Sequence, residues 1–176
     1  MTRSLLSGIL GAFATYGTLV GAESPNATVT KSPDGQFEAV VNDATVRLHL
    51  AGGSRSILLS DAGIDNEYYI HWHPGSRYVA VDIHYGRFAR GMEVYRIGSS
   101  RGIPTSTPLK LPPVTTRVKD KLGIEVSRHN SLQARRWLKS NRLLLDAYGD
   151  DYQAAVIVMI GKLGSVSIES ISDNKQ

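Results

Sequence analysis

The chain of 176 residues contains no cysteine. That absence excludes disulfide bonds, thiol nucleophiles and cysteine-ligated zinc, so the folded chain must be held by its hydrophobic core. Aromatic residues make up only 7% of the sequence, and a formal net charge of +4 is too small to indicate a nucleic-acid partner. No catalytic residue, metal site or cofactor is predicted from these features. What the sequence does contain is an export signal and a repeated β-structure pattern.

The first 22 residues have the layout of a secretory signal peptide. A basic start, Met1 to Arg3, is followed by an apolar stretch and then by small residues before Glu23. We therefore predict cleavage after Ala22 and a secreted or periplasmic location. The rival interpretation is an uncleaved membrane anchor, which needs about 20 apolar residues. Serine, glycine and threonine interrupt this stretch, and no later run approaches that length, so no stable membrane insertion is expected after cleavage.

A short phrase occurs three times, each copy consisting of a strand end, a tight turn and an apolar strand. The copies lie at residues 31–37, 72–78 and 137–143. A recurring unit of this kind predicts a β-repeat array, and short strands separated by turns are typical of an antiparallel meander. The expected fold class is all-β, an antiparallel meander of three blade-like repeats in a single domain over residues 23–176.

The interval before the third repeat contains four prolines and then a segment with helical spacing. Val114, Val118 and Leu122 fall on one face, and Gly123 is a typical stop signal, so residues 114–123 are predicted to form one short helix. Such an apolar stripe normally packs inward, which makes this helix a cover for the end of a sheet. The alternative is a dedicated binding element.

The first repeat carries the most specific motif. Residues 32–35 (Ser-Pro-Asp-Gly), with a Gly-Gly turn at residues 52–53, resemble the blade repeat of TolB-like and WD40-like β-propellers, and residues 72–75 and 137–142 look like degenerate copies. The resemblance implies blades that display protein-binding surfaces. Closed propellers have four or more blades, whereas three are readable here. The array is therefore either open, or closed by a second chain, which would make the protein a homo-oligomer.

The second repeat predicts one hairpin face rich in histidine and tyrosine. A turn at residues 74–77 places Tyr69 opposite Asp82 and Glu67 opposite His84, and the face also includes His71, His73 and Tyr78. We expect this face to be solvated or to contact a partner, with Glu67 and His84 forming a cross-strand pair. A metal would find at most a partial site there, because His71, His73 and Asp82 supply too few ligands.

A glycine-bounded loop follows that hairpin and carries Arg87, Phe88 and Arg90. Arginine with an aromatic residue is a composition that protein interfaces favour, although an ordinary solvated loop is the alternative. The leading hypothesis is an exported, non-enzymatic module that binds a protein partner. Its predicted binding residues are Tyr69, His71, His73, Tyr78, Asp82, Arg87, Phe88 and Arg90.

Two other function classes remain open at this point. One is a metal-dependent or hydrolytic enzyme that uses His71, His73 and Asp82. The other is a binder of anionic glycans, for which Arg87, Arg90 and Arg101 would provide the charge.

Overall fold

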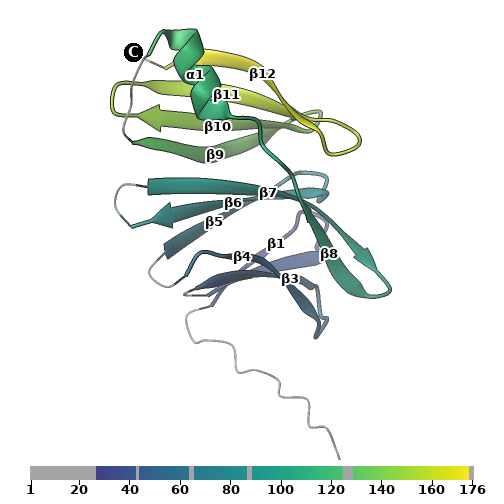
Figure 1. Cartoon of the computed structure of the whole chain (residues 1–176). Coiled ribbons are helices and arrows are strands. Elements are labelled where there is room, and N and C mark those ends of the chain that lie inside the picture. Colours follow the sequence, from purple (N-terminus) through teal and green to yellow (C-terminus); the bar gives the residue numbers. More distant parts are fainter. Residues whose placement is uncertain (1–26, 43, 64–65, 87–88, 125–128, 175–176) are drawn as a thin grey trace, which may run out of the picture.

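The computed structural model describes residues 27–42, 44–63, 66–86, 89–124 and 129–174. These residues form three four-stranded antiparallel sheets and one α-helix (Figure 1), which confirms the all-β prediction. The first sheet contains β1 (Thr28–Lys31), β2 (Phe37–Val41), β3 (Thr45–Leu50) and β4 (Ser56–Asp61). The second contains β5 (Asn66–Trp72), β6 (Tyr78–Tyr85), β7 (Ala89–Ser100) and β8 (Ile103–Pro108). The third contains β9 (Asn130–Leu138), β10 (Arg142–Gly149), β11 (Gln153–Ile160) and β12 (Val166–Asp173).

Each sheet is a meander in which strands adjacent in sequence are also adjacent in space. The repeated phrase places a tight turn between the first two strands of every sheet, although the third turn differs in that Ser140 also has a positive φ, of 60°. Gly35, Ser76 and Asn141 occupy the equivalent position, with φ values of 70°, 52° and 56°. A positive φ is favourable for glycine and costly for most other residues. Ser76 and Asn141 nevertheless adopt the conformation that Gly35 has in the first repeat. The three-repeat prediction is therefore confirmed at the level of local structure.

The equivalent turns also contact one another along the molecule. The backbone N–H of Asp34 donates to Ser76 Oγ at 3.1 Å, which joins the first turn to the second. The Asn141 side chain of the third turn lies close enough to His73 of the second to raise the pKa of that histidine. The repeats are thus stacked with the same end of each hairpin together.

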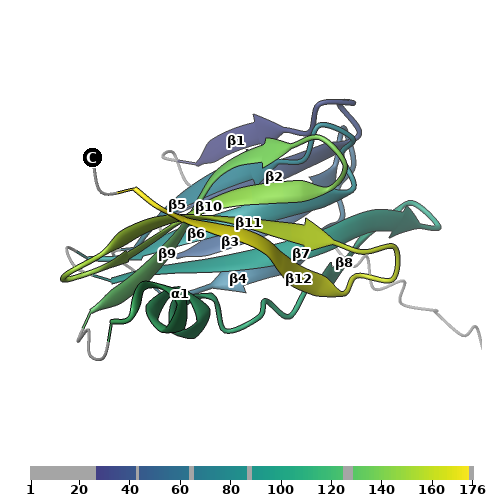
Figure 2. The same ribbon diagram turned by 90° about the horizontal axis from the view of Figure 1, so that it is seen from above.

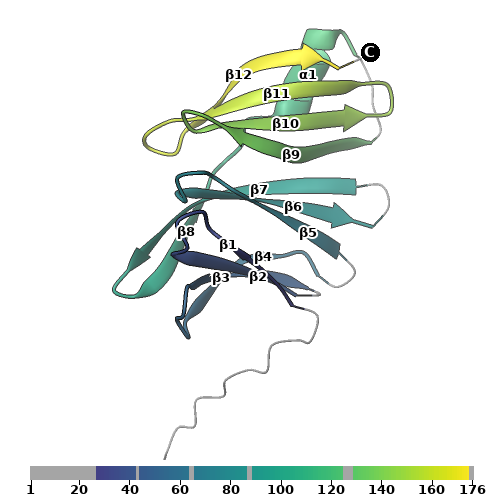
Figure 3. The same ribbon diagram turned by 180° about the vertical axis from the view of Figure 1, so that it is seen from behind.

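The second sheet is the middle layer of the molecule (Figures 1 and 3). One face of β6, with Val79, Val81 and Ile83, packs in a core cluster with the first sheet. The other face, with Tyr78 and Ala80, belongs to a second cluster with the third sheet and the helix. Because both faces of the middle sheet are covered, β6 is buried from Tyr78 to Ile83.

The helix α1 (Val114–Leu122) confirms the predicted segment almost to the residue. Val114 and Val118 are buried, and α1 packs against β9, β10 and β12, so it covers the third sheet as the amphipathic pattern indicated (Figure 2). Gly123 ends it in the left-handed conformation with φ of 67°, and its N–H bonds to the Lys119 carbonyl. Within the described ranges, no helix is long and apolar enough to cross a membrane.

Candidate functional site

The hairpin of β5 and β6 has the predicted register. Glu67 lies opposite His84 and Tyr69 lies opposite Asp82. At the turn, the His73 N–H donates to the Tyr78 carbonyl at 3.0 Å. The predicted cross-strand pair is also present, with His84 Nδ1 3.7 Å from Glu67 Oε2. Alternation in the sequence therefore assigned these side chains to the correct face of the sheet.

The expectation that this whole face is open to solvent or to a partner is wrong. His73 is 8% exposed, Tyr78 is 5% exposed and Asp82 is fully buried. The cause is β9, the edge strand of the third sheet, which lies against β5, β6 and β7. We call this contact between β9 and the second sheet the seam. A protein partner cannot reach residues inside the seam without separating the two sheets.

Asp82 is at the centre of the seam. Its Oδ2 lies 3.0 Å from His71 Nε2, and its Oδ1 accepts the backbone N–H of Ala134 in β9 at 2.8 Å. Both carboxylate oxygens are therefore engaged, as a buried acid requires. Asp82 therefore links the third sheet to the second. The enzyme hypothesis had assigned it the role of a metal ligand or catalytic residue instead.

Aromatic rings fill the turn end of the seam. The Trp137 ring stacks on Tyr78 with centroids 5.9 Å apart, and its edge meets His73 at 5.0 Å. The indole N–H donates to the His71 carbonyl at 2.8 Å. Burial lowers the pKa of His73, with Arg77 acting in the same direction and the nearby Asn141 side chain opposing both. His73 is thus a packed, neutral histidine at neutral pH.

The opposite end of the predicted face is partly accessible, with the His84 side chain 14% exposed. We call it the outer patch: Glu67, Tyr69, His84 and Arg90. Tyr69 is 45% exposed, its hydroxyl donates to Glu67 Oε2 at 2.9 Å, and its ring lies 4.6 Å from the His84 ring. Arg90 on β7 donates to Gln133 Oε1 across the seam. The bond to Glu67 is the main cause that raises the pKa of Tyr69, so its phenol stays protonated near neutral pH.

Of the three arginines proposed for anionic glycans, the two in the described part of the chain lie far apart. Arg87 and Phe88 lie outside the described residues. Arg90 is near the start of β7, and Arg101 is in the turn that follows its end. The two positions are eleven residue steps apart (101 − 90), which along an extended strand is about 36 Å at ~3.3 Å per step. A glycan site shared by Arg90 and Arg101 is therefore excluded within the extended β7.

The enzyme alternative gains no support from the described part of the chain. No group of three or more histidine, aspartate or glutamate side chains there could hold a metal ion. The sequence contains one Gly-x-Ser-x-Gly match, residues 98–102, which sequence reasoning did not identify. In hydrolases that motif forms a turn between a strand and a helix. Here it forms the hairpin turn between the antiparallel strands β7 and β8, so it lacks the geometry of a nucleophile elbow.

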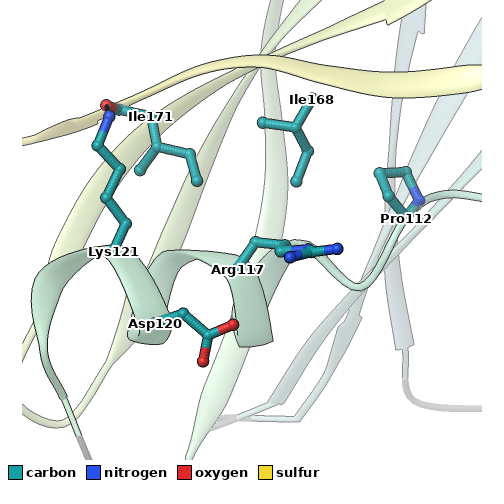
Figure 4. A pocket seen from close by; sticks show the side chains of 6 residues that line it. All are labelled: Pro112, Arg117, Asp120, Lys121, Ile168 and Ile171. Atoms are coloured by element: carbon teal, nitrogen blue, oxygen red, sulfur yellow. Dashed lines mark hydrogen bonds between the residues drawn. The ribbon is translucent and has the colours of Figure 1, made fainter.

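A groove that the sequence gave no means of locating lies between α1 and β12 (Figure 4). Its volume is 590 Å³, and it is lined by Pro112, Arg117, Asp120, Lys121, Ile168 and Ile171. Arg117 and Lys121 of α1 are exposed and lie outside the predicted apolar stripe. Only the tertiary structure places these two residues beside β12. Lys121 contacts Ile171, which is 50 positions further along the chain.

Comparison with known proteins finds no protein-family model that matches the chain and no significant match among curated proteins. The function must therefore be argued from geometry.

Proposed function

We propose that this protein is an exported, non-enzymatic module that binds a protein partner through the outer patch and the adjoining loop between β6 and β7. The observation that carries this proposal is the setting of Tyr69, an exposed aromatic residue fixed between a carboxylate and a histidine ring. The contact surface is smaller than the one predicted from sequence, because the seam removes its inner half.

The chemistry of the outer patch suits a protein interface. Tyrosine and arginine are enriched among residues that dominate binding energy, and charged side chains at the rim steer association. Tyr69 is already held by Glu67 and His84, and Arg90 is held by Gln133. Binding would then order few additional side chains, which lowers the entropic cost of association.

The proposed setting is an open, blade-like array similar to a TolB-like or WD40-like propeller. Three stacked four-stranded meanders support this interpretation. Among the described residues, the first sheet has no sheet before it and the third has none after it, and a second copy could supply those neighbours. Export after cleavage at residue 22 would place the module in the periplasm or outside the cell.

The test is affinity capture from exported proteins with residues 23–176 as bait. We expect one partner to be retained by the unaltered bait and lost with Tyr69→Ala or Arg90→Ala, because hot-spot truncations cost about 2 kcal/mol or more. Met159→Ala is the matched control, since Met159 is 42% exposed and lies on β11, away from the patch. Equal capture by all four baits, or by none, would contradict the proposal.

A further inference from the structure

The groove between α1 and β12 has an apolar floor. Ile168 and Ile171 of β12 and Pro112 before α1 supply that floor. Its volume of 590 Å³ lies within the range of about 300 to 1,000 Å³ that is usual for small-molecule sites. The groove belongs to the third sheet and involves none of the residues of the outer patch.

Two cations of α1 line the groove opposite the isoleucines of β12 (Figure 4). Lys121 Nζ donates to the Ile171 carbonyl at 2.7 Å, which fixes one end of α1 against the strand. Arg117 is exposed and extends along the groove toward Pro112, whereas the Asp120 carboxylate points away from both isoleucines (Figure 4). Among the described residues, no ion pair within 4.0 Å involves Arg117 or Asp120. The groove therefore combines apolar surface with an excess of positive charge.

Strand addition by a partner peptide is the usual use of a groove beside an edge strand, but β12 is poorly suited to it. The register with β11 shifts between Ile157 and Val158, so Glu169 has no cross-strand partner and forms a bulge. Bulges interrupt the hydrogen-bonding edge of a sheet. The Ile171 carbonyl is also already occupied by Lys121. A small ligand fits these features better than an extended chain.

We propose that this groove binds a small organic anion with an apolar tail, such as a medium-chain carboxylate. The carboxylate would pair with the Arg117 guanidinium, for which a planar two-oxygen anion is the geometric match. The tail would lie over Ile168 and Ile171 and remove their apolar surface from water. This inference goes beyond the proposed function, because a failure at the groove leaves protein binding at the outer patch unaffected.

The experiment titrates residues 23–176 with decanoate, decanol and butyrate below the micelle concentration of decanoate and follows binding by calorimetry. We expect saturable binding of decanoate at one site, with decanol and butyrate each weaker by roughly tenfold or more, since one lacks the charge and the other the tail. Arg117→Gln should weaken decanoate binding by a similar factor. Arg101→Gln, an exposed arginine in the turn after β7, should leave it unchanged.

The location of the site is checked by NMR of the isoleucine methyl groups. The methyl resonances of Ile168 and Ile171 should shift when decanoate is added. Equal affinity for decanoate and decanol would overturn the proposal, because the site would then recognise only the tail. Unchanged binding in Arg117→Gln, or no saturable binding of decanoate, would overturn it as well. Arg117 is exposed on α1, so its replacement is not expected to prevent folding.

Discussion

At the scale of single residues, His73 shows how packing changes the chemistry of a side chain. In the sequence it belongs to a histidine-rich face and could serve as a ligand or as an interface residue. In the structure it is surrounded by the rings of Tyr78 and Trp137. Burial favours its uncharged form, so its role is to pack and to accept the Gly75 N–H at 2.9 Å.

The lowered pKa of His73 predicts a loss of stability in acid. In the unfolded chain the residue takes up a proton near its ordinary pKa of 6.5, whereas in the folded protein it does so only at lower pH. Below pH 6.5 the unfolded state therefore binds more protons, and the free energy of unfolding falls until the folded-state pKa is passed. Chemical denaturation between about pH 8 and about pH 5 measures this fall.

The fall should be smaller in His73→Gln than in the unaltered protein. Burial also lowers the pKa of His84, so part of the pH dependence should persist in that variant. His49→Gln, on the first sheet, is the control for the loss of an imidazole. A pH dependence that is identical in the unaltered protein and His73→Gln would rule out His73 as a source of the acid sensitivity.

At the scale of elements, the seam contains several polar contacts, and those of the fully buried Asp82 are the most shielded from water. Asp82 of β6 binds both His71 and the backbone of β9. Asp82→Ala would leave the Ala134 N–H without its acceptor and His71 without its carboxylate. We expect a loss of about 3 kcal/mol in the free energy of unfolding, measured by urea denaturation. Asp61→Ala, at an exposed position of β4, should change it by less than about 0.5 kcal/mol. A similar small effect for both variants would show that the seam does not depend on Asp82.

The strand β8 shows where local sequence rules misled at this scale. Its two prolines, Pro104 and Pro108, predicted an extended segment and gave no reason to expect a paired strand. They are accommodated because β8 is the edge of the second sheet, with a partner on one side only. A proline lacks the N–H donor, which is tolerable on an edge and costly in a central strand.

At the scale of the whole molecule, a stack of three sheets leaves two outer faces without a neighbouring sheet. On the first sheet, Val29, Val40, Arg47 and Leu58 form a cross-strand row, and Val29 and Leu58 are 45% and 47% exposed. The equivalent face of the second sheet is buried against the first. Apolar residues exposed at the end of a repeat array are a typical surface for association.

If two chains complete one array through this face, the protein should be a dimer in solution and Leu58→Asp should yield monomers. Sedimentation equilibrium measures the mass directly. Leu163→Asp is the control, because Leu163 is exposed in the turn between β11 and β12 and outside that row. A monomeric unaltered protein would contradict closure by a second copy and leave an open array.

The sequence by itself determined the turns, the strand alternation, the helix and the three-repeat order. These depend on residues close together in the chain, such as residues 32–35 or the spacing of Val114 and Val118. Which face of the middle hairpin reaches solvent was decided only by the tertiary structure. Asp82 accepts the backbone N–H of Ala134 in β9, which is 52 positions away in the sequence. The alternation of residues separates the two faces of a strand but does not show which other strand will cover each face. The same reason applies to the groove, because it exists only where α1 meets β12.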